Sequence, residues 1–284
     1  MTAKIIDGRL VANKIRILLE ETINKLNRKG TSPCLATVLV GKDDASTIYV
    51  NSKQKAALDL GIKTKDFRLD LNTSENELCD LVSSLNEDRN IHGILVQMPL
   101  PPHIDESSVI NKINQAKDVD GLTPSNAGLL VNGLDSLVPC TPLGILELLK
   151  FYQIGVESMN TAIVNRSKLV GIPLAHLMLQ KNATVTICHS KTKQLENLLS
   201  EADLIVTAVG NASMFRLTSN MVKEGTIVID VGNNRLNGKV TGDVDFESVR
   251  HKASWITPVP GGVGPMTITM LLSNTVKAAS QLNA

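Results

Sequence analysis

The stretch T-A-I-V-N-R-S-K-L-V-G-I-P-L-A-H-L-M-L-Q, residues 161–180, decides the fold class. Its first four residues form a short apolar run typical of a buried strand, and an apolar segment of helical length begins near Ile172. A strand, a tight turn and a helix open a dinucleotide-binding unit, whose turn is usually built on closely spaced glycines. Here Gly171 is the only glycine, and Asn165 and Arg166 occupy the turn. The stretch predicts an α/β unit and leaves open whether a nucleotide binds there.

The chain after this stretch keeps alternating apolar runs with segments of helical length. Further strands are expected at 183–188, 203–209, 226–231 and 254–257, and helices at 171–181, 191–199 and 218–223. Strands separated by short helices favour a Rossmann-type domain, which we place at residues 141–266. The segment 258–266, P-V-P-G-G-V-G-P-M, is expected to be irregular, and a final helix is expected at 267–281.

The first half alternates in the same way and predicts a second domain. Its strands are expected at 34–40, 65–69 and 91–98, and its helices at 9–29, 46–60, 75–86 and 105–116. The run C-L-A-T-V-L-V at 34–40 is apolar throughout, which suits a parallel sheet covered on both faces. Residues 117–143 lack periodicity and predict a long connection, before a helix from about 141 to 152. The fold class is therefore α/β with two domains: an N-terminal α/β domain with a mainly parallel sheet over 1–140, completed by the C-terminal helix 267–284, and the Rossmann-type domain.

Composition excludes several classes of partner. A net charge of +1 gives no basic field to attract nucleic acid, and 2% aromatic residues give no base-stacking surface. No apolar run is long enough to span a membrane and no signal-peptide core opens the chain, so we expect a cytoplasmic protein. The cysteines show no C-x-x-C pair and the histidines no ligand spacing, which predicts reduced thiols and no metal site.

Three polar side chains of the first half are expected at the carboxyl edge of its sheet, where ligands bind in α/β folds. Tyr49 and Lys53 lie four residues apart and share one face of a helix that follows a strand. Gln97 closes the strand 91–98 and can both donate and accept hydrogen bonds. From the residues alone, the pair can equally be a solvated helix face and Gln97 a turn cap.

The irregular segment K-D-V-D-G, residues 117–121, carries two carboxylates. Asp118, Asp120 and Gly121 are all common turn residues, and the segment by itself favours a role in turn geometry. In the alternative interpretation, a carboxylate faces a ligand that presents several N–H groups.

The second strand of the Rossmann-type domain ends in His189-Ser190-Lys191. NAD sites usually carry a carboxylate there, bonded to the ribose diol, whereas this edge carries Ser190 and Lys191. With Arg166 in the first turn, the edge favours a 2′-phosphate and hence NADP over NAD. An ordinary solvated strand end is the alternative.

Nine motifs run in one order across nearly the whole chain. They are V-G-K-D-D-A-S-T-I-Y-V-N-S-K (40–53), G-I-L-V-Q-M-P-L-P-P-H-I (93–104), K-D-V-D-G (117–121), P-C-T-P-L-G (139–144), R-S-K-L-V-G-I-P (166–173), A-T-V-T-I-C-H-S-K-T (183–192), A-D-L-I-V-T-A-V-G (202–210), I-D-V-G (229–232) and P-V-P-G-G-V-G-P-M-T (258–267). Together they resemble the bifunctional methylenetetrahydrofolate dehydrogenase/cyclohydrolase family. The set is specific, although no single motif decides the matter.

The resemblance implies a catalytic first domain and an NADP-binding second domain. Methylenetetrahydrofolate would be oxidised by NADP⁺ to the methenyl form, which water would open to formyltetrahydrofolate. Lys53 would be the main catalytic residue, with Tyr49 orienting it, Gln97 bonded to it and Asp120 holding the pterin. The implied binding residues are Asn165, Arg166, Ser167, Ser190, Asn233, Gly264 and Thr267 for the cofactor, and Tyr49, Asp120, Pro260, Gly261 and Gly262 for the folate. The resemblance also implies a homodimer and a place in purine biosynthesis.

Elementary electrostatics makes the lysine role reasonable. The methenyl intermediate is cationic, and a neighbouring cation disfavours a protonated amine. A neutral Lys53 could then accept a proton from the attacking water, which a guanidinium could not do.

The chain departs from the family pattern mainly on the cofactor side. Asn165 and Asn233 stand where the family usually has glycine and isoleucine, while G-L-T-P at 121–124 and Leu129 also differ. The folate set is intact, so we expect cyclohydrolase activity more firmly than ordinary NADP-linked dehydrogenase activity. Two alternatives remain within reach: a cyclohydrolase with weak or altered nucleotide use, and a non-catalytic folate-binding paralogue. A shikimate-type dehydrogenase would share the layout but would not explain Tyr49 and Lys53 beside V-Q-M-P-L-P-P.

Overall fold

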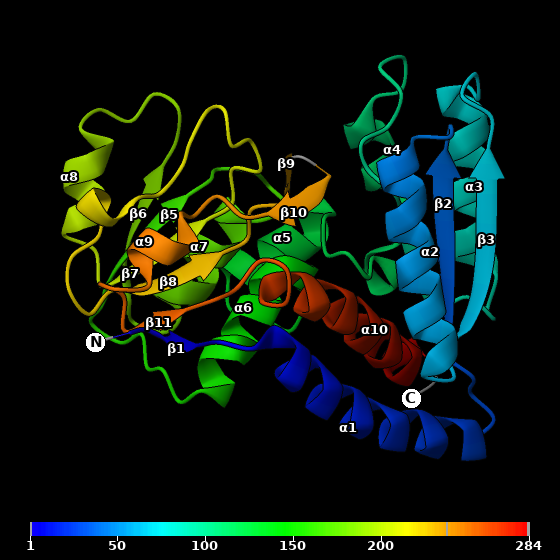
Figure 1. The fold of residues 1–284 in the computed structure, drawn as a ribbon. Coiled ribbons are helices and arrows are strands. Elements are labelled where there is room, and N and C mark those ends of the chain that lie inside the picture. The colour runs from blue at the N-terminus through cyan, green and yellow to red at the C-terminus, as the bar shows by residue number, and fades with distance from the viewer. Residues whose placement is uncertain (1, 237, 283–284) are drawn as a thin grey trace. The chain divides into compact units, whose positions relative to one another are not determined.

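A computed structural model describes residues 2–236 and 238–282 (Figure 1). The chain divides into two compact units, and each is made of two segments. Unit 1 comprises Met1–Asn13 and Thr141–Thr267, and unit 2 comprises Lys14–Cys140 and Ile268–Ala284. The sequence predicted domains over 1–140 and 141–266, but residues 1–13 belong to the unit that contains 141–267. The reason is that residues 4–5 pair with a strand of that unit.

Unit 1 is built on a parallel sheet whose strand order is β1-β11-β8-β7-β5-β6. The strands are β1 (Lys4–Ile5), β5 (Asn160–Val164), β6 (Thr184–Cys188), β7 (Leu204–Thr207), β8 (Ile227–Asp230) and β11 (Trp255–Ile256). β7 and β8 are buried at every residue, as a sheet covered on both faces requires. The chain runs from β5 outward to β6 and then returns to the other side of β5 to form β7. This reversal of strand order is the topological switch point of a doubly wound sheet.

The other elements of unit 1 follow the expected pattern with some differences. They are α6 (Cys140–Phe151), α7 (Gly171–Leu179), α8 (Leu195–Ser200), the 3₁₀ turn η2 (Ser219–Met221), the antiparallel pair β9 (Asn234–Leu236) and β10 (Lys239–Thr241), and α9 (Phe246–Val249). The helix expected at 218–223 is only the short turn η2, and the helix expected from residue 191 begins at Leu195. The sequence pattern did not predict β1, β9, β10 or α9, because two to four residues are too few to show a period.

The segment 258–266 was expected to be irregular, and this prediction is wrong for its last four residues. Helix α10 spans Val263–Leu282 and so includes Pro265 in its first turn. Proline is tolerated there because the first N–H groups of a helix have no partner within the helix.

Unit 2 is built on a parallel three-stranded sheet with β2 (Cys34–Val40) in the middle. Its neighbours are β3 (Lys63–Leu69) and β4 (Gly93–Val96), and all seven residues of β2 are buried. The helices are α1 (Gly8–Arg28), α2 (Asp44–Asp59), α3 (Glu75–Glu87), α4 (Glu106–Lys112), the 3₁₀ turn η1 (Gln115–Lys117) and α5 (Pro124–Val131). α1 and α10 lie side by side (Figure 1), and Arg16 Nε donates to Thr269 Oγ1 at 3.0 Å.

Two expectations for unit 2 need correction. Residues 117–143 were expected to form an irregular connection, yet they contain α5, whose start is capped by Thr123 accepting from the Asn126 N–H at 3.3 Å. The helix expected at 105–116 is divided into α4 and η1. Within the described residues, no helix is long and apolar enough to cross a membrane.

Candidate active site

Helix α2 presents Tyr49 and Lys53 directly after the carboxyl end of β2. Asp43 caps the helix by accepting from the Ser46 N–H at 2.8 Å, which fixes where the helix begins. Tyr49 is 44% exposed, whereas Lys53 is half-buried. The two residues therefore lie at the edge of the sheet where ligands of α/β proteins bind.

Lys53 and Gln97 meet in the structure. The Lys53 Nζ donates to Gln97 Oε1 at 3.0 Å, and Gln97 Nε2 donates to the Met98 carbonyl at 2.6 Å. Gln97 follows β4, so two neighbouring strands deliver the pair to one edge of the sheet. The second hydrogen bond fixes the orientation of the Gln97 amide. Its NH₂ group is bonded to the Met98 carbonyl, so its oxygen is directed to the Lys53 ammonium.

The two carboxylates of K-D-V-D-G have different surroundings. Asp118 is buried and accepts from the Leu122 N–H at 3.1 Å, the Thr123 N–H at 2.8 Å and Asn126 Nδ2 at 2.9 Å. The interpretation as a turn residue is confirmed for this carboxylate. Just before it, the buried Lys117 Nζ donates to three carbonyl oxygens around the end of α3, at 2.7 to 3.2 Å. The segment 117–121 is therefore anchored by the side chains of its first two residues, Lys117 and Asp118.

Asp120 is placed differently from Asp118. Burial raises the pKa of the Asp120 carboxyl, while the nearby Lys53 ammonium and a hydrogen bond from the Cys140 thiol lower it. Burial likewise raises the pKa of Cys140 well above its usual range, so this thiol stays protonated beside the carboxylate. Unit 2 thus brings a lysine, an amide and a partly desolvated carboxylate within electrostatic reach of one another.

One residue of this arrangement was missed by sequence reasoning. Asn274, on α10, is buried, and its Nδ2 donates to the Val119 carbonyl at 2.8 Å and the Val138 carbonyl at 2.9 Å. It also lies 3.8 Å from Cys140 Sγ. These contacts tie the residue before Asp120 to the segment before Cys140. Asn274 is one of several polar residues in α10, so nothing in the sequence pattern distinguishes it from the others.

The turn after β5 carries the first group of predicted cofactor-binding residues. Asn165 Oδ1 accepts from the Ser167 N–H and hydroxyl, each at 2.7 Å, and from the Gly171 N–H at 3.0 Å. A side chain at Gly171 would lie 2.1 Å from the Asn165 carbonyl, so glycine is required there by close packing. Asn165 itself does not have a positive φ, so its backbone does not need the conformational freedom of glycine. Arg166 is exposed beside this turn.

The end of β6 carries the second group. The Lys191 N–H donates to His189 Nδ1 at 3.1 Å, and Thr192 Oγ1 accepts from the His189 N–H at 2.8 Å, so the turn is held by its own residues. Ser190 and Lys191 are exposed at its tip. This edge presents a hydroxyl and an ammonium group, which are suited to an anionic ligand.

Buried carboxylates organise the loops that follow β7 and β8. Asp243 accepts from the Val209 N–H at 2.6 Å and the Gly210 N–H at 3.0 Å. Asp230 accepts from the N–H groups of Gly232 at 2.9 Å and Asp243 at 3.0 Å. Burial raises the pKa of Asp230 to about 6, and the neighbouring Asp243 adds to this, although backbone N–H donors oppose it.

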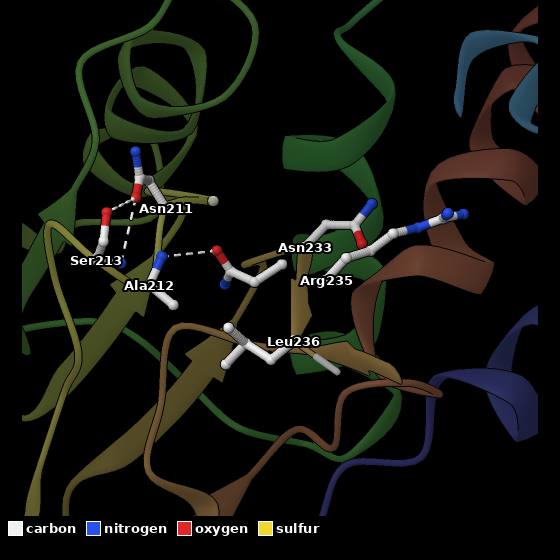
Figure 2. Close-up of a pocket in the computed structure, with 8 residues that line it drawn as sticks. Asn211, Ala212, Ser213, Asn233, Arg235 and Leu236 are labelled. Atoms are coloured by element: carbon white, nitrogen blue, oxygen red, sulfur yellow. Dashed lines mark hydrogen bonds between the residues drawn. The ribbon is translucent and has the colours of Figure 1, made fainter. Parts of the chain in front are cut away.

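A pocket of about 300 Å³ lies between these loops and β9. Figure 2 shows Asn211 and Ser213 on one side of it and Asn233 and Arg235 on the other. Asn234 also lines the pocket, and its Oδ1 accepts from the Ala212 N–H at 2.8 Å, which joins β9 to the loop after β7. Asn233, the second departure from the family pattern, is exposed at this pocket.

The segment before α10 is packed closely against the N-terminus of α1. The Gly8 N–H donates to the Gly261 carbonyl at 2.9 Å, and a side chain at Gly8 would lie 1.7 Å from the Gly262 carbonyl. Pro260 is exposed, Gly264 is exposed at the start of α10, and Thr267 Oγ1 lies 2.9 Å from Thr141 Oγ1. Among the described residues, no group of three histidine, cysteine, aspartate or glutamate side chains could hold a metal ion.

A doubly wound unit with exposed polar and basic side chains after β5 and β6, together with an α/β unit that pairs a lysine with an amide, has the features of a two-domain enzyme of dinucleotide chemistry. The tetrahydrofolate dehydrogenase/cyclohydrolase catalytic domain matches residues 6–120, and the NAD(P)-binding domain of the same family matches residues 139–283. The chain belongs to the tetrahydrofolate dehydrogenase/cyclohydrolase family. Membership removes the shikimate-type alternative.

Relatives extend the match to the full length. A bifunctional protein FolD from Cenarchaeum symbiosum is 55% identical over 96% of this chain and 97% of its own length. The crystal structure of the FolD dehydrogenase/cyclohydrolase from Campylobacter jejuni is 49% identical with a TM-score of 0.96, over 98% of this chain and 99% of that one. A FolD structure from Trypanosoma brucei, complexed with NADP cofactor and inhibitor, is 37% identical with a TM-score of 0.93, over 99% of this chain and 98% of that one.

Proposed function

We propose that this protein is an NADP-dependent methylenetetrahydrofolate dehydrogenase and methenyltetrahydrofolate cyclohydrolase of one-carbon metabolism. It oxidises 5,10-methylenetetrahydrofolate to the 5,10-methenyl form and hydrolyses that product to 10-formyltetrahydrofolate. The observation that carries the assignment is the hydrogen bond of 3.0 Å between Lys53 and Gln97, because it joins two motif residues of the family that lie 44 positions apart.

Lys53 is the proposed general base of the hydrolysis. A bound methenyl cation disfavours the protonated ammonium, and the neutral amine can take a proton from the water that attacks the cationic carbon. Gln97 Oε1 orients the amine, since the other end of this amide is bonded to the Met98 carbonyl. Tyr49, one turn earlier on α2, is proposed to lie along the folate and to orient Lys53 with it.

Asp120 is the proposed pterin-binding carboxylate. Its partly desolvated position makes hydrogen bonds to it stronger, and the N–H groups of a pterin are donors of the right kind. Asp118, by contrast, holds the turn through three hydrogen bonds of its own. Pro260, Gly261 and Gly262 are proposed as further folate contacts, and this proposal rests on the family resemblance.

NADP fits the residues at the carboxyl edge of the unit 1 sheet. No carboxylate follows β6, where an NAD site would carry one, and Ser190 and Lys191 are exposed there instead. Arg166 is proposed to bind the 2′-phosphate side of the cofactor, while Ser167, Asn233, Gly264 and Thr267 are proposed to line the rest of its site. The bound cofactor would supply the hydride acceptor of the first reaction.

Two assays on the purified protein test the assignment. The first follows NADP⁺ reduction with methylenetetrahydrofolate, and the second follows loss of the methenyl form without cofactor. We expect the wild type to catalyse both and Lys53→Met to lose hydrolysis by at least about a hundredfold, as removal of a general base requires. Lys55→Met, on the same helix but exposed, is the matched control and should retain hydrolysis. Full hydrolysis by Lys53→Met would remove the proposed role of this lysine.

Three finer features are proposed on the family resemblance alone. The protein would act as a homodimer in the cytoplasm, and its formyl product would serve purine biosynthesis. Light scattering coupled to size exclusion tests the first of these, since a mass near 61 kDa would be twice the chain mass of 30.6 kDa.

A further inference from the structure

The Asn165 side chain spans the crevice at the topological switch point of unit 1. β5 and β7 are neighbours in the sheet, and the chain leaves them in opposite directions. Asn165 follows β5, and its Nδ2 donates to the carbonyl of Ala208, the residue that follows β7, at 2.6 Å. Ligands of doubly wound folds enter between these two loops, so this hydrogen bond crosses the entrance.

The other end of the same amide occupies the start of α7. Asn165 Oδ1 accepts from the N–H and hydroxyl of Ser167 and from the N–H of Gly171, the first residue of the helix. Three donors converge on this one oxygen. A neutral carboxamide oxygen therefore stands where a cofactor phosphate oxygen would be received in a dinucleotide site.

The rest of the first turn of α7 is also satisfied internally. The Val170 N–H donates to Ser167 Oγ at 3.1 Å, and the Ile172 N–H donates to the Ser167 carbonyl at 3.1 Å. Pro173 has no N–H to offer. The start of a helix usually presents free N–H groups that can bind an anion. In α7, every N–H group at residues 170–173 is already hydrogen-bonded to Asn165 or Ser167.

We propose that the Asn165 side chain competes with the cofactor pyrophosphate for the start of α7 and so lowers the affinity for both dinucleotides. The inference rests on the proposed function, because it concerns the NADP site of unit 1. A bound pyrophosphate must either displace the Asn165 amide or bind without the helix N–H groups. Cofactor binding then depends more heavily on the exposed side chains Arg166 and Lys191, which are the proposed partners of the adenosine 2′-phosphate rather than of the pyrophosphate.

Calorimetric titration of three ligands tests this inference. NADP⁺ and NAD⁺ both carry a pyrophosphate, whereas adenosine 2′-phosphate carries only the other anionic group. In Asn165→Gly we expect NADP⁺ and NAD⁺ to bind about tenfold more tightly, as one recovered hydrogen bond to a charged group allows. Adenosine 2′-phosphate should bind as it does to the wild type. Unchanged or weaker dinucleotide binding, or an equal shift for all three ligands, would overturn the inference.

Two further variants keep the test decisive. Asn165→Ala removes the amide without adding a flexible glycine, so it decides the question if Asn165→Gly does not fold, and tighter dinucleotide binding is again expected. Asn165→Asp keeps an oxygen beside α7, replaces the amide NH₂ by a second oxygen and adds a negative charge, so it should weaken the binding of both dinucleotides at least about tenfold. Dinucleotide binding by Asn165→Asp equal to that of the wild type would count against the competition.

The proposed function can fail separately. If the wild type reduces NADP⁺ but Asn165→Gly binds NADP⁺ no more tightly, the inference about Asn165 is wrong and the proposed function stands. A wild type that binds neither dinucleotide contradicts the dehydrogenase half of the proposed function. In that second case, binding gained by Asn165→Gly would still support the inference about Asn165.

Discussion

Removing the Asn274 side chain amide should destabilise unit 2 and disturb the folate site together. In Asn274→Ala the carbonyls of Val119 and Val138 lose donors at 2.8 and 2.9 Å. The Val119 carbonyl lies 3.3 Å from Cys140 Sγ, whose single S–H it shares with Asp120, whereas among the described residues the Val138 carbonyl has no second donor.

The size of the effect follows from these contacts. Two lost hydrogen bonds are worth about 0.5–1.5 kcal/mol each, and a buried carbonyl without a donor adds about 1 kcal/mol or more. We therefore expect the free energy of unfolding to fall by about 2–3 kcal/mol. Because Val119 directly precedes Asp120, we also expect the KM for the folate substrate to rise several-fold, with a smaller change in kcat.

Urea unfolding followed by two signals measures this. The chain has one tryptophan, Trp255, which lies in unit 1, so its fluorescence reports that unit, while far-ultraviolet circular dichroism reports both. The transition seen by circular dichroism should move to lower urea in Asn274→Ala. Asn132→Ala is the matched control, because its amide donates to the Gly128 carbonyl at 2.7 Å on the exposed end of α5. If Asn274→Ala stays within about 0.5 kcal/mol of the wild type and keeps its KM, the reasoning is refuted.

Three further predictions follow from the same structure. Asp120→Asn should raise the folate KM by about tenfold without loss of hydrolysis at saturation, and an unchanged KM in steady-state assays would exclude its pterin role. Gly121→Ala should cost about 2 kcal/mol or more in urea unfolding, because φ is +71° and the added carbon would lie 2.6 Å from the Leu137 carbonyl oxygen; equal stability would contradict this strain. Since burial raises the Asp230 pKa to about 6, the folded state holds a proton that the unfolded state releases, so this group makes stability fall as pH rises from about 4 to about 6. Between about pH 4 and pH 6 the free energy of unfolding of the wild type should fall by about 1–3 kcal/mol more than that of Asp230→Asn, as measured by urea unfolding at each pH. Parallel pH–stability curves would show that Asp230 does not titrate in this range.

The elements with long apolar runs could be predicted from the sequence. Residues 34–40 and 161–164 form strands as expected, because continuous runs of apolar residues suit a sheet buried on both faces. The pairing of Lys53 with Gln97 was expected from the resemblance, and spacing alone left it open. The separate environments of Asp118 and Asp120 required the structure, since both are turn residues by composition.

The parts that were missed have different physical causes. β1 has two residues, and its pairing with β11 joins segments about 250 positions apart, which no local pattern reports. The start of α5 carries a readable signal in Thr123 followed by Pro124, a capping residue and a first-turn proline. At Asn165 the sequence showed only a departure from the family's usual glycine, whereas the structure shows the asparagine side chain accepting three hydrogen bonds that hold the turn.

The division of the chain into two discontinuous units has a consequence for its synthesis. Unit 1 needs β1 from the first residues made and β11 from near the end, and unit 2 needs the last part of α10 with its Asn274. A nascent chain that has emerged as far as residue 260 therefore contains neither unit in complete form. A stop codon at or before codon 274 should harm the folate unit, even though the family's catalytic-domain match ends at residue 120. A fragment cut at that boundary would carry Lys53, Gln97 and Asp120 but not the helix that holds the last of them in place.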